Sequence, residues 1–104
     1  MRELGPAEVR ARLDDDVPPV LLDVRERWEV ETAAIEGALH VPMADIPGAL
    51  GALPNDREIV VFCHTGGRSY TAARLLERAG FEVANLAGGI DAWSREVDPA
   101  IPTY

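Results

Sequence analysis

The sequence predicts an α/β fold in which helices cover both faces of a parallel sheet. Short apolar runs alternate with helical stretches along the chain, and such alternation requires crossover connections between parallel strands. The chain has 104 residues, which suits a single domain over residues 1–104. Hydrophobic residues make up 47%, which is enough for a core and too much for a disordered chain.

The first half of the chain contains two candidate strands and three candidate helices. A proline at the first helical position opens a helix over residues 6–13. A continuous apolar run at 20–22 is typical of a buried parallel strand. A short helix is expected over 27–32 and a short strand over 39–41. Residues 44–53 favour a helix that proline and glycine interrupt.

The second half contains the clearest strand and the longest helix. Residues 59–62 are β-branched or aromatic and predict a buried strand. A helix is expected to begin near Ser69 and to end at Gly80, a natural residue after a helix C-terminus. Its apolar stripe recurs at helical spacing and consists of Ala72, Leu75, Leu76 and Ala79. A strand over 83–86, a helix over 90–95 and an irregular tail complete the chain.

Composition limits the partners of the protein. The formal net charge is -8, so phosphate backbones and anionic lipid surfaces would be repelled, and neither nucleic acid nor membrane is expected as a partner. The first residues lack the apolar stretch of a signal peptide, which predicts a cytoplasmic protein. The single cysteine cannot form an internal disulfide and fits a reducing compartment. No spaced ligands predict a metal site, and no cofactor is expected.

The loop between the strand 59–62 and the following helix has the features of an anion site. It consists of Cys63, His64, Thr65, Gly66, Gly67 and Arg68. The two glycines allow successive amides to curl round an anion, and the arginine adds a permanent charge. The helix behind the loop directs unpaired N–H groups and the positive end of its dipole at it. Ligands of parallel sheets bind beyond the carboxyl ends of the strands, which is where this loop lies.

Cys63 is the candidate nucleophile of the loop. A free thiol has a pKa of about 8.5, and a helix N-terminus with a nearby cation lowers it. We therefore expect a thiolate at neutral pH that reacts as a nucleophile. The alternative is a cysteine that only fills the core, the usual role of a lone cysteine after an apolar strand. Two glycines, an arginine and a helix start within so short a span favour catalysis.

Several segments resemble the signatures of the rhodanese-like sulfurtransferases, and together they cover nearly the whole chain. They are residues 21–25 with Trp28 and Glu29, residues 35–42, the loop 63–68 and residues 86–93. The resemblance implies a three-layer rhodanese-like fold with a five-stranded, mainly parallel sheet. It also implies that Cys63 takes sulfur from a small anion such as thiosulfate, or from a persulfide donor, and holds it as a persulfide. Cyanide, a thiol or a sulfur-accepting protein would then remove it.

Roles follow for the residues of the loop. We expect the amides of residues 64–68 to cradle the persulfide, so that the side chains matter less. Arg68 either clamps thiosulfate or forms a salt bridge that steadies the loop. Thr65 either donates its hydroxyl or faces solvent. His64 is not expected to act as a general base, because a thiolate needs none.

Three polar residues are expected behind the loop: Asp23, Arg25 and Ser69. Asp23 and Arg25 follow a buried strand, and we expect them to support the loop by hydrogen bonds; a solvated surface pair is the alternative. Trp28 and Trp93 are expected in the core or in the wall of the pocket.

Two other functions compete with sulfur transfer. Cysteine phosphatases and arsenate reductases also place a thiolate before an arginine, but with five residues between them, whereas only four lie between Cys63 and Arg68. The shorter loop suits a sulfur atom and crowds a tetrahedral oxyanion. A non-catalytic rhodanese-like interaction module is the second alternative. Such modules usually lack the cysteine, which is present here.

Overall fold

The computed structural model describes residues 1–104 and contains a five-stranded sheet in which every pairing is parallel. The strands are β1 (Arg2–Leu4), β2 (Val20–Asp23), β3 (Leu39–His40), β4 (Ile59–Phe62) and β5 (Val83–Leu86). Their order is β1-β5-β4-β2-β3, so β4 lies at the centre of the sheet. The α/β class and the mainly parallel sheet predicted from the sequence are confirmed.

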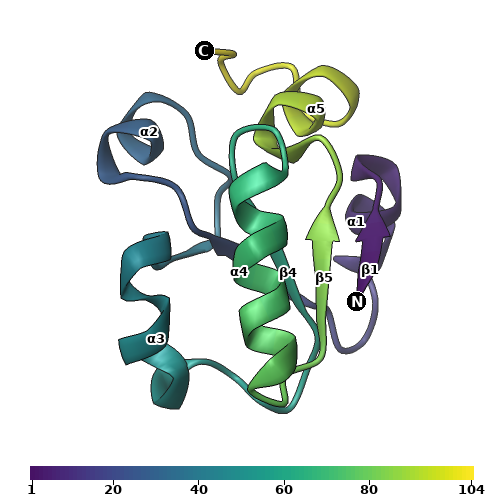
Figure 1. Ribbon diagram of the computed structural model, residues 1–104. Coiled ribbons are helices and arrows are strands. Elements are labelled where there is room, and N and C mark those ends of the chain that lie inside the picture. Colours follow the sequence, from purple (N-terminus) through teal and green to yellow (C-terminus); the bar gives the residue numbers. More distant parts are fainter.

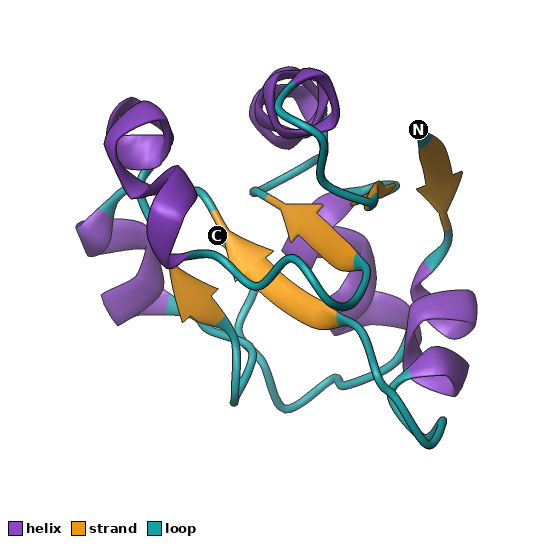
Figure 2. Cartoon of the chain, turned by 90° about the horizontal axis from the view of Figure 1, so that it is seen from below, coloured by secondary structure: helices purple, strands orange, loops and turns teal.

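Helices lie on both sides of this sheet (Figure 2). They are α1 (Pro6–Arg12), α2 (Arg27–Thr32), α3 (Ile46–Ala49), α4 (Gly67–Arg78) and α5 (Gly89–Glu96). In Figure 1, α4 crosses in front of β4 and α3 lies beside it, whereas α1 lies behind β1. None of these helices combines the length and the apolar character that crossing a bilayer requires.

The central strand β4 is buried on both faces, and its side chains alternate between two cores. Val60 and Phe62 belong to the core formed with α1 and α5. Ile59 and Val61 belong to the core formed with α3 and α4. Cys63, the next residue in this alternation, points to the same side as Val61 and therefore toward α4. The alternation of side chains along β4 therefore places the Cys63 side chain on the face of the sheet that α4 covers.

The structure differs from the sequence prediction in two elements, β1 and α4. The edge strand β1 was not predicted, because only Leu4 of its three residues is buried and no alternation is visible in so short a run. Helix α4 begins at Gly67, two positions before the expected start near Ser69. The interrupted helix expected over residues 44–53 is confirmed, since two 3₁₀ turns flank the four-residue α3.

The C-terminus of α4 ends as its sequence predicts. Gly80 adopts a φ of 97°, and its N–H donates to the carbonyl oxygen of Glu77 at 3.1 Å. The N–H of Phe81 donates to the carbonyl oxygen of Leu76 at 3.1 Å. This pair of bonds is a Schellman motif, and Phe81 packs against the core on the α4 side. Helix α4, whose N-terminus lies in the loop 63–68, therefore has a well-defined C-terminus.

Candidate active site

The loop 63–68 leaves the carboxyl end of the central strand β4 and runs directly into α4. Cys63 is 1% exposed, and its side chain borders the apolar core on the α4 side. Its Sγ nevertheless accepts a hydrogen bond from the N–H of Gly66 at 3.1 Å. The sulfur therefore has an apolar wall on one side and a main-chain donor on the other.

Two opposing influences set the pKa of Cys63. Burial is the larger single influence and raises the pKa, because a thiolate loses its hydration. Hydrogen bonds from the Ser69 side chain and from the amides of Ser69, Gly66 and Thr65 lower it, and together they prevail. The Ser69 hydroxyl has a single proton and lies 2.6 Å from Asn85 Oδ1 as donor, so we attribute the lowered pKa chiefly to the amides.

The two loop glycines have different roles. Gly66 adopts a φ of 113°, in the left-handed region that favours glycine, and this conformation turns its N–H toward the sulfur. Gly67 has no positive φ and is the first residue of α4, and a Cβ there would meet no atom within 4 Å. The loop therefore uses the conformational freedom of glycine at Gly66 and not at Gly67.

The N-terminus of α5 holds the carbonyl groups of the active loop. The N–H of Ile90 donates to the Cys63 oxygen at 2.9 Å, and the N–H of Asp91 donates to the His64 oxygen at 3.1 Å. Gly89 makes this approach possible: its φ is 61°, and a Cβ there would lie 2.5 Å from the Cys63 oxygen. Because α5 binds the carbonyl groups, the N–H groups of the loop remain available to the sulfur. Gly89 is thus a site residue that the sequence reasoning treated only as a turn.

Glu29 is a second site residue that was not predicted. Helix α2 begins with a capping box in which the Glu26 N–H donates to Glu29 Oε1 at 3.1 Å. The same carboxylate accepts two bonds from Arg68, from Nη1 at 2.7 Å and from Nη2 at 2.9 Å. The Arg68 bonds hold the pKa of Glu29 at about 2 although burial opposes this. In turn, they raise the pKa of Arg68.

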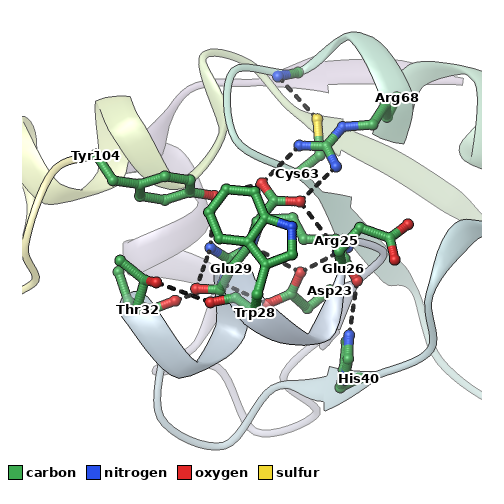
Figure 3. Close-up of polar contacts among 12 residues, drawn as sticks. Asp23, Arg25, Glu26, Trp28, Glu29, Thr32, His40, Cys63, Arg68 and Tyr104 are labelled. Carbon is green, nitrogen blue, oxygen red and sulfur yellow. Dashed lines mark hydrogen bonds and ion pairs between the residues drawn. The ribbon is translucent and has the colours of Figure 1, made fainter.

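Of the two arrangements expected for Arg68, the structure shows the salt bridge. Each Nη atom donates to one oxygen of the Glu29 carboxylate (Figure 3). The guanidinium still favours an anion nearby, since a Cys63 thiolate contributes to the raised pKa of Arg68. Arg68 therefore acts on the sulfur through space while its fork of donors holds the loop to α2.

Tyr104, in the tail that was expected to be irregular, closes this charged network. Its hydroxyl donates to Glu29 Oε2 at 2.7 Å and accepts from Arg25 Nη1 at 2.8 Å. Burial raises the pKa of this hydroxyl, which keeps the proton that it donates. Its ring stacks on His64 with a centroid distance of 4.0 Å and meets the edge of Trp28 at 6.0 Å. The tail is thus anchored against the active loop.

Asp23 and Arg25 form a buried pair and not the solvated pair weighed as the alternative. Arg25 is 0% exposed and donates from Nε and Nη2 to the two oxygens of Asp23 at 2.9 and 2.7 Å. The guanidinium of Arg25 also donates to the carbonyl oxygen of Glu29 in α2, to that of Ala33 just after α2, and to the Tyr104 hydroxyl. No hydrogen bond joins the pair to a side chain of the loop, so they support it through Glu29 and Arg68 (Figure 3).

A second, mainly uncharged network braces the other side of the loop. Ser69 is buried, and its hydroxyl donates to Asn85 Oδ1 of β5 at 2.6 Å. Asn85 Nδ2 donates to the Gly66 carbonyl oxygen at 3.1 Å and to Glu3 Oε1 at 2.9 Å. Ser69 was expected behind the loop, whereas Asn85 and Glu3 were not identified from the sequence.

The side chains of the remaining predicted residues form no hydrogen bond with the sulfur. Thr65 is exposed, so its side chain faces solvent, the second of the two arrangements expected for it. His64 stacks on the tail, and its Nε2 is buried with no hydrogen-bond partner. Trp93 is buried in the core with α5, but Trp28 is 60% exposed and lies on the surface next to the site.

Comparison with known proteins agrees with this geometry. A family model described as a rhodanese-like domain matches residues 5–96. A putative sulfurtransferase of Bacillus subtilis, YtwF, is 35% identical over 95% of this chain and 96% of its own length. A sulfurtransferase of Allochromatium vinosum is 36% identical over 97% of this chain and 95% of its own length. A rhodanese-related protein of Thermoplasma volcanium superposes with a TM-score of 0.88 at 25% identity, and each chain covers 100% of the other.

Proposed function

The chain belongs to the rhodanese-like domain family, and we propose that it is a sulfurtransferase that carries a sulfane sulfur on Cys63. The observation that carries this proposal is the Gly66 N–H at 3.1 Å from Cys63 Sγ, in a loop where other elements bind the carbonyl oxygens of Cys63, His64 and Gly66. The amides of Thr65 and Ser69 also favour the thiolate. Such a ring of amides stabilises an anionic sulfur, whether a thiolate or the terminal atom of a persulfide.

In the first half-reaction the Cys63 thiolate attacks the outer sulfur of thiosulfate. An S–S bond forms between Sγ and that atom, and the bond from the outer sulfur to the sulfite sulfur breaks. The electron pair of the broken bond leaves with sulfite, and the negative charge left on the enzyme resides on the terminal persulfide sulfur. No oxidant or proton is consumed. The lowered pKa of Cys63 supports this step, because the thiolate and not the thiol is the nucleophile.

In the second half-reaction an acceptor removes the terminal sulfur. A thiolate or cyanide attacks that atom, a new S–S or C–S bond forms, and the Sγ–S bond breaks with its electron pair returning to Cys63. The Cys63 thiolate is regenerated inside the same ring of amides. Because sulfite leaves before the acceptor binds, we expect ping-pong kinetics.

The burial of Cys63 favours sulfur transfer over phosphate chemistry. The residue is 1% exposed, so one terminal sulfur atom reaches it more easily than a tetrahedral phosphoryl group. Each Nη atom of Arg68 already donates to Glu29, so this arginine is not free to surround a phosphate group with all of its donors. A non-catalytic module remains the second candidate, and it predicts an intact fold with a Cys63 that thiosulfate does not modify.

The mass of the intact protein after treatment with thiosulfate tests the proposal. We expect a gain of one sulfur atom, which cyanide removes with formation of thiocyanate and which is absent in Cys63→Ala. A mass that stays unchanged in the folded protein would support the non-catalytic module. Hydrolysis of an aryl phosphate that is lost in Cys63→Ser would instead support a phosphatase.

A further inference from the structure

The ten basic residues of the chain are all arginines, and their pairing is uneven. Eight of them lie within 4.0 Å of a carboxylate oxygen. The two exceptions are Arg74 and Arg78, which lie on consecutive turns of the same helix, α4, and are exposed. In a chain with a net charge of -8, two adjacent uncompensated guanidinium groups form a local exception to the acidic surface.

These two arginines belong to a stripe along the outer side of α4 that also contains Tyr70. The three residues are four positions apart and therefore lie on one face of the helix. Tyr70 is 41% exposed, and its ring is one of the few large hydrophobic side chains on the surface. All three residues border a surface hollow of about 390 Å³. We call Tyr70, Arg74 and Arg78 the α4 stripe.

The α4 stripe begins at the active loop. Helix α4 starts at Gly67, and the Tyr70 N–H donates to the carbonyl oxygen of Gly66 at 3.1 Å, so Tyr70 lies one helical turn beyond Gly66. The 12 residues of the helix span about 18 Å. In Figure 1 the loop lies at the upper end of α4, and the helix runs from there along the front of the molecule. An extended segment lying on the stripe would have one end at the loop that contains Cys63.

The charge around the stripe is not cancelled by its one acidic neighbour. Glu77 lies between the two arginines in sequence, but its carboxylate binds the ammonium group of Met1 at 2.5 Å. That ammonium group is the main cause of the lowered pKa of Glu77, and Arg74 and Arg78 add a smaller contribution. The guanidinium groups therefore keep their donors free for carboxylates of another molecule.

We propose that the α4 stripe docks an acidic protein segment whose end carries the sulfur-accepting thiol. The two arginines would bind carboxylates through their planar donors, and the Tyr70 ring would cover the aliphatic part of the segment. The acidic remainder of the surface repels the same partner, so that it is oriented onto α4. This inference rests on the proposed sulfurtransferase function and names the chemistry of its acceptor.

Two synthetic acceptor peptides test the inference. One has four glutamates followed by a glycine and a terminal cysteine, and the matched one has glutamine in place of glutamate. The measured quantity is kcat/KM for sulfur transfer from thiosulfate to each peptide, at low and at physiological ionic strength. The acidic peptide is expected to be the better acceptor, with an advantage that shrinks as salt is added.

Charge reversal in the stripe provides the decisive variant. In Arg74→Glu/Arg78→Glu we expect the kcat/KM for the acidic peptide to fall about tenfold or more. The control Arg10→Glu/Arg95→Glu changes the net charge equally but alters α1 and α5 on the opposite face of the sheet, and it should keep the preference for the acidic peptide. Thiosulfate-to-cyanide turnover should remain unchanged in both variants.

The outcomes separate this inference from the proposed function. If the wild-type chain forms no persulfide, the proposed function fails before the peptides are compared. If persulfide forms but both peptides accept sulfur equally, or both double variants lose the preference equally, the stripe is not a docking surface. A loss of cyanide turnover in Arg74→Glu/Arg78→Glu alone would mean that the stripe attracts the small anionic donor, and it would also overturn the inference.

Discussion

The two sides of the active loop are held in different ways. On the side of α2 the contacts are charged and reach a side chain: Glu29 binds Arg68, and Tyr104 and Arg25 continue the network. On the side of β5 and α5 the contacts reach the main chain and are mostly uncharged, since Asn85 and the first amides of α5 bind loop carbonyl groups. The difference shows that the loop's fixed charges largely neutralise one another, whereas its main-chain geometry is left to stabilise the sulfur anion.

One added methyl group, at Gly89, should break the contacts between α5 and the main chain of the loop. Gly89→Ala places a Cβ against the carbonyl oxygens of Cys63 and His64 at a φ of 61°, so the α5 amides must withdraw from the loop. We expect a loss of about 2–4 kcal/mol in the free energy of unfolding, together with loss of persulfide formation. Urea denaturation and the mass of the thiosulfate-treated protein measure the two effects.

Gly67→Ala is the matched control for that change. A Cβ at Gly67 meets nothing within 4 Å, and the residue lies in the first turn of α4 without a positive φ. We expect the variant to be as stable as the wild type or more stable by about 0.5 kcal/mol, with persulfide formation intact. Equal damage from the two substitutions would show that Gly67 tolerates a side chain no better than Gly89 does, and the specific role given to α5 would be wrong.

Glu29→Gln tests the charged contacts on the α2 side of the loop. The pKa of Glu29 is about 2 in the folded chain against 4.5 ordinarily, so its ionised form stabilises the fold above pH 4.5. This stabilisation is lost as the pH falls from 4.5 toward 2. Because the Arg68 side chain is 40% exposed, we expect the substitution to cost only about 1–2 kcal/mol at neutral pH.

The measurement for Glu29 is a series of urea denaturations from neutral to acidic pH. The difference in the free energy of unfolding between wild type and Glu29→Gln should be constant above pH 4.5 and should vanish near pH 2. Other carboxylates titrate equally in both proteins and cancel from the difference. A difference that does not depend on pH would mean that the Glu29 carboxylate stabilises the fold only as a neutral hydrogen-bonding group.

This contrast also explains how far sequence reasoning could go. The strand β4, the start of a helix after the loop, and Cys63 as the nucleophile candidate depend on local patterns of a few residues. The pairing of Arg68 with Glu29 joins residues 39 positions apart, and that of Asn85 with Glu3 joins residues 82 apart. No periodicity encodes such pairs. The family signature contains Glu29 but does not tell which partner its carboxylate meets.

The role of α5 and of the tail was hidden for another reason. The residues Gly88–Gly89 look like an ordinary turn in the sequence, and only the structure shows that the helix they open meets the carbonyl groups of a loop 25 positions earlier. The tail contains two prolines, which correctly indicate irregular structure but say nothing about where Tyr104 packs. The edge strand β1 has no alternation long enough to detect.

The smallest effect on persulfide formation is expected for Ser69→Ala, which separates the Ser69 hydroxyl from the amides as causes of the lowered Cys63 pKa. Removing the hydroxyl in Ser69→Ala leaves Asn85 Oδ1 without its donor, which should cost about 1–2 kcal/mol of stability. The amides of Ser69, Gly66 and Thr65 remain, so the Cys63 pKa should rise yet stay below its ordinary value. Persulfide formation should persist.

A pH titration of the thiolate's ultraviolet absorbance measures this pKa, with Cys63→Ala subtracting the contribution of the tyrosines. Thr65→Ala is the control, because its side chain is exposed and its amide is unchanged, and it should titrate like the wild type. If Ser69→Ala brings the Cys63 pKa to or above that of an ordinary thiol, the hydroxyl and not the main chain stabilises the thiolate. The β5 side of the loop would then stabilise the sulfur through the Ser69 side chain. The contrast between charged side chains on one side and main-chain donors on the other would be wrong.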